Sequence, residues 1–510
     1  MEVALKSIEE RVQEIEKLRL NLLSGRSGGA PEKTGRLSAR DRLGKLLDHG
    51  TFREIEMFSS PVKLGLTTHS VRGDGVISGY GKVNNRTVCV WAQDSDVLEG
   101  RVGVVHGAKI VRLTERALRA RVPCIGIMDS EGIRIEEMIS TPTNYSYDRL
   151  AYVQTMASGV IPQISLVMGP CLGASAICAQ LADFVFMVRG TSYSSVYSAK
   201  KDDESFKLGT AEVHYTRSGC CDVLEDSEEE CIDKARELLN FLPLNNSGEI
   251  PVVASGDDPE REVPELFEIV PADSKKPYCI KDVIIRIVDN SQFIEIKGGW
   301  ATNLVVGFGR FGGSSAGIIG NNPQVLGGCL DVDAADKLSR FVRFCDAFNI
   351  PIIYLADTPA FLPGKEQEQR GIIRHGSKVV YSNSEATVPQ IQIYLRKCYG
   401  GGNLAMPGNN LGGDFGLAWP SAEVLLMHPE GAVSIIYRKD IEVAKDPKAE
   451  FERKLGEFKD SGSVEKMWEA LTVQDYINPK DTRSKIVQAL EVLQGKTIET
   501  HWKRHDNMPL

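Results

Sequence analysis

The order of hydrophobic and polar residues along this chain predicts the same series of strands and helices twice. Each series begins with two segments in which apolar residues alternate with small or polar ones, at 75–82 and 86–91 in the first series and at 305–311 and 316–319 in the second. Alternation with a period of two is typical of β-strands, and two such runs joined by a short polar connection predict a hairpin.

After each hairpin the spacing becomes helical and then changes to short apolar runs. The helical segments are 109–120 and 333–348, and the apolar runs are 123–128, 163–168, 351–356 and 390–395. The first run of each series is followed by an aspartate, Asp129 or Asp357, and the second run is followed by a turn of small residues. This alternation of strands and helices predicts an α/β fold of stacked layers, with the loops gathered at the strand ends.

Residue identities indicate that the two series are copies of one domain. Tyr80-Gly81 corresponds to Phe308-Gly309, Arg121-Val122-Pro123 to Asn349-Ile350-Pro351, and Asp129 to Asp357, each 228 positions later (308 − 80, 349 − 121, 357 − 129). Further on, Ile161-Pro162 corresponds to Val388-Pro389, and Gly173-Ala174-Ser175 to Gly400-Gly401-Gly402, each 227 positions later (388 − 161, 400 − 173). One residue of drift over this distance indicates a tandem duplication of a whole domain.

The duplication fits the length of the chain, because 510 residues exceed what a single hydrophobic core usually serves. We predict an N-terminal domain over residues 1–260 and a C-terminal domain over residues 261–510. The acidic, proline-rich stretch 256–277 is predicted to be the linker between them.

The two ends of the chain are predicted to be mainly helical. Residues 1–23 have helical spacing and are followed by a flexible break at 24–35, after which Ser38 and Asp41 predict a capping box that opens a helix through Leu47. The tail from 440 to 493 has the pattern of charged amphipathic helix, interrupted at Asn478-Pro479.

Charge and cysteine content narrow the function classes. The net charge of −9 argues against a nucleic-acid-binding protein, which would present a basic face. No apolar run approaches the roughly 18 residues of a membrane span, and the N-terminus lacks the pattern of a secretion or transit signal. The eleven cysteines contain no CxxC pair, so we interpret them as reduced core residues of a cytoplasmic protein and predict no metal site.

A literal dinucleotide-binding pattern occurs in the second copy, but its context is wrong. Gly307-Phe-Gly-Arg-Phe-Gly312 has the required glycine spacing, with Asp331 about twenty residues later. The fingerprint requires a helix after the glycines to receive the pyrophosphate, whereas here a second strand of a hairpin is predicted. We therefore expect no nucleotide site at this position.

The turns that follow the second apolar runs are the strongest candidates for a functional site. They are Gly169-Pro-Cys-Leu-Gly-Ala-Ser175 and Tyr399-Gly-Gly-Gly-Asn403. Small residues let a ligand approach the backbone, and the N–H groups that start a helix have no partners within it. Such donors stabilise an enolate or oxyanion, each worth roughly 2.7–4 kcal/mol in well-studied enzymes. Tight packing is the alternative, but two equivalent turns favour an enzyme that holds two carbonyl groups.

Three other features are weaker candidates. Arg134 follows a predicted strand end, where it is either an anion-binding residue or a surface arginine. The loop from Asp357 to Gly364 is interpreted as structural, and His375 as a packed or capping histidine rather than a general base.

Longer motifs give the chain a resemblance to a known family. They include Gly35-Arg-Leu-Ser-Ala-Arg-Asp-Arg-Leu43, Gly73-Asp-Gly-Val-Ile-Ser-Gly-Tyr-Gly81, Gly371-Ile-Ile-Arg-His-Gly376, Arg396-Lys-Cys-Tyr-Gly-Gly401 and Glu430-Gly-Ala-Val-Ser-Ile-Ile-Tyr-Arg438. From about Gly35 to Leu493 the chain resembles the carboxyltransferase (β) subunits of biotin-dependent acyl-CoA carboxylases, such as propionyl-CoA carboxylase, and the α subunits of methylmalonyl-CoA decarboxylases.

The resemblance implies two tandem crotonase-like domains and a homohexamer with active sites between chains. It implies that a carboxyl group passes between N1 of biotin and the α-carbon of an acyl-CoA thioester. The first turn (Gly173, Ala174, Ser175) would hold the thioester carbonyl, and the second (Gly401, Gly402) the ureido carbonyl of biotin. Residues assigned to binding the two ligands are Gly132, Arg134, Ile135, Tyr399, Gly400 and Leu404. The chain has no biotinyl site of its own, so a biotin carboxyl carrier protein and a biotin carboxylase subunit are the expected partners.

The departures from the family pattern lie mainly on the acyl-CoA side. The family's Gly-Gly-Ala-Arg-Ile is Glu131-Gly-Ile-Arg-Ile135 here, Glu99-Gly100 replaces a Gly-Gly pair, and the loop 193–210 is shortened. Two alternatives therefore stand beside a carboxyltransferase: a non-catalytic assembly partner, and a biotin-independent lyase or hydratase that uses a carboxylate such as Glu131. The sequence determines neither the acyl group nor the direction of the reaction.

Overall fold

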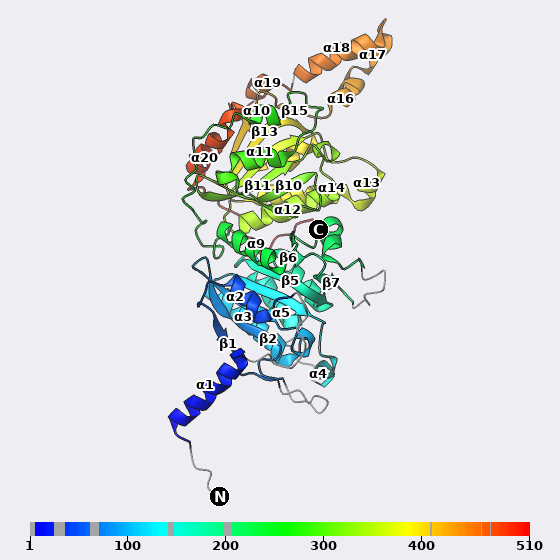
Figure 1. Ribbon diagram of the computed structural model, residues 1–510. Helices are drawn as coiled ribbons and strands as arrows, with labels where there is room; N and C mark the ends of the chain where they lie inside the picture. Colours follow the sequence, from blue (N-terminus) through cyan, green and yellow to red (C-terminus); the bar gives the residue numbers. More distant parts are fainter. Residues whose placement is uncertain are drawn as a thin grey trace. The chain divides into compact units, whose positions relative to one another are not determined.

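The computed structural model in Figure 1 describes residues 6–24, 36–61, 71–140, 147–197, 207–408, 411–460, 462–469 and 471–509. The chain forms two compact units, Met1–Leu239 and Asn240–Leu510. Residues 25–35 of the predicted break and residues 198–206, half of the shortened loop 193–210, lie outside the described residues.

The first unit is built on a sheet with the strand order β1-β2-β3-β4-β5-β6-β8, in which β7 also pairs with β5. The strands are β1 (Arg53–Ile55), β2 (Val76–Val83), β3 (Arg86–Gln93), β4 (Cys124–Ser130), β5 (Gln163–Leu172), β6 (Phe184–Val188), β7 (Tyr193–Ser195) and β8 (Val223–Glu225). Pairing is antiparallel from β1 to β3 and parallel from β3 onward. The helical elements are α1 (Ile8–Ser24), α2 (Ala39–Leu46), η1 (Leu98–Gly100), α3 (Val104–Ala120), α4 (Ile135–Ser140), α5 (Tyr147–Ala157), α6 (Ala174–Gln180), α8 (Ala211–Val213), η2 (His214–Ser218) and α9 (Glu228–Phe241).

The second unit repeats this sheet, with the order β16-β14-β13-β12-β11-β10-β9 and β15 paired to β13. Its strands are β9 (Ile294–Ile296), β10 (Leu304–Phe311), β11 (Ser314–Asn321), β12 (Ile352–Thr358), β13 (Gln390–Tyr399), β14 (Phe415–Ala418), β15 (Glu423–Leu425) and β16 (Asp475–Tyr476). Its helical elements are α10 (Leu266–Ile269), α11 (Ile280–Ile287), η3 (Asp289–Ser291), η4 (Leu326–Gly328), α12 (Val332–Ala347), α13 (Lys365–Arg370), α14 (Ile372–Glu385), α15 (Gly401–Ala405), α16 (Pro429–Ile436), α17 (Arg438–Val443), α18 (Pro447–Asp460), α19 (Val464–Glu469), η6 (Pro479–Asp481) and α20 (Thr482–Leu493).

The α/β class, the two hairpins and the buried strands predicted from the sequence are confirmed. The glycine pattern at Gly307–Gly312 lies in the hairpin of β10 and β11, which pair antiparallel, so it opens no helix. The capping box at Ser38 and the interruption of the C-terminal helices at Asn478-Pro479 are also present. Within the described residues, none of the helices has the length and apolarity to cross a membrane.

The predicted linker is wrong. Residues 256–277 belong to the second unit, and Val263 and Leu266 are fully buried in its hydrophobic core. Composition indicated a linker because acidic residues and prolines are common in exposed segments. Val263, Leu266 and Val270 nevertheless pack into the core, whereas Phe267 is exposed.

The duplication extends to buried polar contacts within each unit. The side-chain carbonyl of Gln93 accepts the N–H of Asp129 at 3.1 Å, and that of Asn321 accepts the N–H of Asp357 at 3.1 Å. Lys109 donates to the carbonyls of Gly73 and Val76, while its counterpart Lys337 donates to those of Lys297, Trp300 and Leu304. Burial lowers the pKa of Lys109 to about 8. Each ammonium thus binds backbone carbonyls at and before the first strand of a hairpin, β2 in the first unit and β10 in the second.

Replacing Lys337 with methionine should lower the unfolding free energy of the second unit by about 2 kcal/mol, because buried carbonyls lose their donor. Urea denaturation measures this, with the exposed Lys466→Met as control. Equal midpoints for the two variants would contradict a structural role for the Lys337 ammonium.

Candidate functional site

The turn after β5 presents backbone N–H groups at the start of a helix. Gly173 has φ 65° and ψ −129°, a combination that strains any residue with a side chain, and its N–H donates to the carbonyl of Ser195 at 2.8 Å. Helix α6 begins at Ala174, and its first turn closes where the N–H of Ala176 donates to the carbonyl of Gly173 at 3.1 Å. The N–H groups of Ala174 and Ser175 therefore precede the hydrogen bonds of the helix.

The turn after β13 has the same geometry. Gly400 has φ 49° and ψ −119°, and its N–H donates to the carbonyl of Leu425 at 2.8 Å. The N–H of Asn403 donates to the carbonyl of Gly400 at 3.1 Å, so Gly401 and Gly402 occupy the positions of Ala174 and Ser175. In both units the short strand that pairs beside the turn, β7 or β15, supplies the carbonyl that fixes it. The two turns are thus equivalent in structure as well as in sequence.

Close packing explains why the second turn consists of glycines. A Cβ at Gly402 would lie 2.7 Å from the methyl of Thr358, and one at Gly401 would lie 2.8 Å from the ring of Phe361. Phe361 and Leu404 then line a pocket of about 1100 Å³ whose walls are mainly apolar. Leu404 was predicted from the sequence to lie on this side, whereas Phe361 was not among the predicted residues.

Tyr399 lies apart from that pocket. Its side chain lines a smaller pocket of about 190 Å³ together with Lys397 and His428, and its hydroxyl donates to Glu423. Burial, followed by the hydrogen bond to Glu423, raises its pKa. The structure therefore brings Leu404 to the large pocket and Tyr399 to a different one.

The residues assigned to acyl-CoA binding surround the end of β4. Ser130 pairs with Cys171, two residues before Gly173, which brings the loop 131–135 next to the first turn. Gly132 has φ 105° and its N–H donates to the hydroxyl of Ser130 at 3.2 Å. Ile135 begins α4 with 62% of its surface exposed. A ligand at the first turn would therefore meet this loop.

Arg134 does not face solvent. Its side chain is 2% exposed and forms ion pairs with Asp74 and Glu137. Burial raises the pKa of Asp74, and the neighbouring guanidinium opposes this rise. The surface-arginine interpretation is wrong, and the observed contacts make Arg134 the interior anchor of the loop; direct binding of a ligand by it stays a prediction.

The acidic substitutions on this side point outward. Glu99 is in the left-handed region at φ 55°, where the second unit has Gly327 at φ 61°, and its carboxylate pairs with Arg101 at 2.6 Å. Glu131 is exposed, and its N–H donates to the carbonyl of Glu99 at 3.2 Å. The backbones of Glu99 and Glu131 are therefore joined beside the end of β4, and both side chains are exposed to water.

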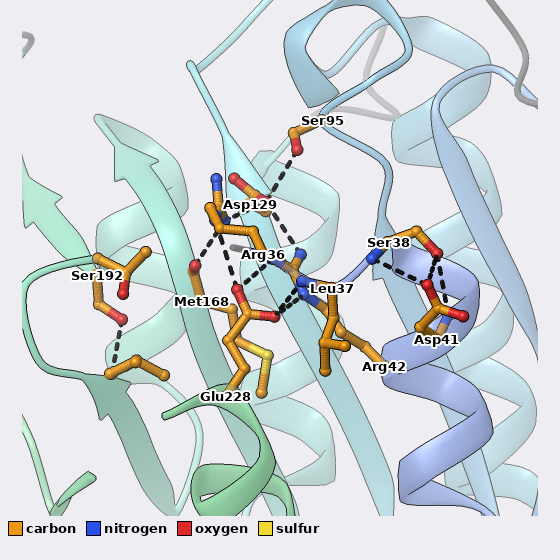
Figure 2. Close-up of polar contacts among 12 residues, drawn as sticks. Arg36, Leu37, Ser38, Asp41, Arg42, Ser95, Asp129, Met168, Ser192 and Glu228 are labelled. Carbon is orange, nitrogen blue, oxygen red and sulfur yellow. Dashed lines mark hydrogen bonds and ion pairs between the residues drawn. The ribbon is translucent and has the colours of Figure 1, made fainter. Parts of the chain in front are cut away.

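A buried charge cluster fixes the strand ends of the first unit, as Figure 2 shows. Asp129 pairs with Arg36 at 2.5 Å and with Arg42 at 2.9 Å, and Arg42 also pairs with Glu228 at 2.7 Å. The hydroxyl of Ser95 donates to the carboxylate of Asp129 at 2.9 Å. Because the side chains of Arg42 and Asp129 are almost fully buried, neither charge has water as an alternative partner.

The second unit satisfies its aspartate differently. Arg396 of β13 pairs with Asp357 at 2.7 Å, and both side chains are fully buried. The position equivalent to Arg396 in the first unit is Gly169, where a Cβ would lie 2.0 Å from Asp129 and 2.6 Å from Arg36. A glycine at 169 thus leaves room for arginines that enter from α2 and the residues before it.

His375 is packed, as the sequence analysis expected. It is 9% exposed, and its Nδ1 lies 2.7 Å from a carboxylate oxygen of Asp336, which also pairs with Lys378. This histidine ties α14 to α12 and is absent from the residues that line the large pocket.

Comparison with known proteins extends over nearly the whole chain. The family described as carboxyl transferase domain matches residues 31–508. The propionyl-CoA carboxylase carboxyltransferase subunit of Haloferax mediterranei is 40% identical, covering 99% of this chain and 100% of that protein. The methylmalonyl-CoA decarboxylase subunit alpha of Veillonella parvula is 41% identical, covering 98% and 99% respectively.

Solved structures agree with these relatives. The hexameric transcarboxylase 12S, determined with methylmalonyl-coenzyme A and methylmalonic acid bound, has a TM-score of 0.94 at 38% identity and covers 99% of each chain. The duplicated crotonase-like fold implied by the resemblance is confirmed.

Replacing Arg42 with leucine should lower the unfolding free energy of the first unit by about 3–5 kcal/mol, because Glu228 and Asp129 lose a buried partner. Arg40→Leu is the matched control: its pair with Glu54 is 33% exposed on the arginine side, and such pairs contribute up to about 1 kcal/mol. Chemical denaturation of both variants measures the difference, and equal losses would show that the cluster is not what fixes the strand ends.

Proposed function

The chain belongs to the carboxyl transferase domain family, and on that basis we propose that it moves a carboxyl group between N1 of biotin and the α-carbon of an acyl-CoA thioester. The single observation that carries the proposal is the pair of equivalent turns, each offering two helix-start N–H groups. Both substrates carry a carbonyl oxygen on which negative charge develops during transfer, and a pair of backbone donors is suited to each.

The second turn fits the ureido group of biotin. Gly400, Gly401 and Gly402 carry no side chains of their own that could cover the N–H groups at the start of α15. The adjacent apolar pocket, with Phe361 and Leu404 in its wall, suits the hydrocarbon part of biotin. The first turn, with Ala174 and Ser175, would then receive the thioester.

The residues act through position and electrostatics. Biotin held at the second turn would supply a ureido nitrogen, N1, that carries the carboxyl group and takes up the proton of the thioester α-carbon. The N–H groups of Ala174 and Ser175 donate to the thioester oxygen and stabilise the charge that appears when the α-carbon loses its proton. Those of Gly401 and Gly402 would donate to the ureido oxygen of biotin and stabilise negative charge on it. The same contacts serve the reverse reaction.

Propionyl-CoA and methylmalonyl-CoA are the proposed substrate pair, since they name the relatives that match over the whole chain. A biotin carboxyl carrier protein and a biotin carboxylase are the proposed partners, a hexamer the proposed assembly, and the cytoplasm the proposed location. The hydratase alternative needs a carboxylate directed at the thioester, but Glu99 is paired with Arg101 and Glu131 is exposed. Nothing in this geometry favours that alternative over carboxyl transfer.

The proposal predicts that the protein removes the carboxyl group from methylmalonyl-CoA only when biotin is present. Loss of the carboxyl group is measured with free biotin, and malonyl-, ethylmalonyl- and glutaconyl-CoA are tested in parallel. A Gly401→Pro/Gly402→Pro variant should lose at least about 10²–10³-fold in kcat, because proline removes the N–H donors and its ring also crowds Phe361 and Thr358. Glu366→Pro, at an exposed position in the first turn of α13, is the control for proline at the start of a helix. A folded oligomer without turnover on any thioester would favour the non-catalytic partner.

Removing negative charge beside the first turn should strengthen thioester binding. Glu99→Gln and Glu131→Gln are expected to lower the KM for methylmalonyl-CoA about two- to fivefold at low salt, because exposed carboxylates repel the CoA phosphates. The effect should disappear near 0.5 M salt, where the screening length is only a few ångströms. Glu366→Gln is the control, and a KM that ignores both charge and salt would place the phosphates elsewhere.

A further inference from the structure

The large pocket beside the second turn has a wall made from the end of the chain. Phe361 and Leu404 line it near the turn, and α14 contributes residues such as Ile372 and Val380. The remaining side is lined by Ile498, Glu499, Thr500, His501, Lys503 and Pro509. We name residues 497–509 the C-terminal segment. It contains no helix or strand, so only its contacts with other residues hold it in place.

One clamp holds the chain just before the segment. The ammonium of Lys496 donates to the carbonyl of Val388 at 2.8 Å and pairs with Asp414 at 2.7 Å. Its side chain is only 8% exposed, so this contact is shielded from water. The segment therefore leaves α20 in a fixed direction, toward the pocket.

A second clamp is a closed ring of four charges. Arg343 of α12 pairs with Glu385 at the end of α14, Glu385 with Lys503, Lys503 with Asp506, and Asp506 with Arg343. Burial of Asp506 raises its pKa, but the hydrogen bonds from Arg343 and Lys503 outweigh this and lower it overall. A ring in which each charge has two opposite neighbours holds its members better than isolated surface pairs do.

The pocket-lining residues of the segment lie mostly between these clamps. Ile498 to His501 follow Lys496 and precede Lys503, whose ammonium also lies 5.9 Å from the centre of the Tyr381 ring, another part of the wall. The two clamps thus determine the position of the part of the pocket wall that Ile498 to His501 form.

We propose that the C-terminal segment positions the biotinyl group at the second turn by forming the far wall of its pocket. This rests on the proposed function, because it takes the second turn to be the biotin side. Apolar surface such as Ile498, which lines the same pocket as Leu404, contacts the hydrocarbon part of biotin. The segment touches no reacting atom and acts by fixing the orientation of the ligand.

A variant lacking residues 498–510 keeps the Lys496 clamp and removes the wall. It should raise the KM for free biotin about tenfold or more and leave the KM for methylmalonyl-CoA within about twofold. Lys503→Met keeps the wall but opens the charge ring, and should raise the KM for biotin about threefold. Lys281→Met is the matched control, since its pair with Glu295 lies in the same unit and is similarly exposed.

Equilibrium dialysis with labelled biotin measures the same effect without turnover. A truncated protein that binds biotin as tightly as the full chain, with unchanged KM values, would overturn the inference while leaving carboxyl transfer intact. A full-length chain that neither turns over nor binds biotin would overturn both proposals. Loss of biotin binding on truncation, with normal thioester KM and an unchanged oligomer, supports the positioning role.

Discussion

A carboxylate buried at the end of a parallel strand is the constraint around which each unit is organised. Asp129 and Asp357 are 1% and 0% exposed, and an unpaired charge in such a place costs several kcal/mol. Each unit must therefore bring an arginine to the same point. The residue beside the aspartate, Gly169 or Arg396, lies four positions before the glycine that opens the turn. Neutralising the charge thus also fixes the strand that carries the backbone donors.

The two units neutralise the buried aspartate with arginines from different parts of the chain. The second places the arginine on the strand itself, and the first leaves a glycine there and recruits two arginines from outside the sheet. The turns keep one geometry despite this difference, because backbone groups rather than side chains define them. Side chains around the first turn can therefore differ from those around the second without changing the path of the main chain. Glu99, for example, occupies the position equivalent to Gly327 and has the same left-handed backbone conformation.

Local pattern sufficed for much of the fold. The hairpins and the buried strands were predicted because period-two alternation and short apolar runs are properties of neighbouring residues. The linker prediction failed because the burial of Val263 and Leu266 depends on a core that composition does not show. Arg134 was recognised as notable, but its partner Asp74 lies 60 positions earlier, too far for any spacing rule.

The site was predicted in the same uneven way. Both turns were located, since small residues after a buried strand are visible in the sequence. The pocket was not, because Phe361, Leu404 and Ile498 come from three distant segments whose meeting depends on the folded chain. The repeated lysines were a missed signal: Lys109 and Lys337 stand at the offset already found for the hairpins.

The arginine exchange has a consequence for the order in which the chain can fold as it leaves the ribosome. In the second unit, Arg396 and Asp357 emerge 39 residues apart on neighbouring strands. In the first, Arg42 must wait for Asp129, 87 residues later, and for Glu228, 186 residues later. The buried charge cluster of the first unit is therefore incomplete until almost the whole unit has been synthesised. Until then two arginines, Arg36 and Arg42, share the single carboxylate of Asp129.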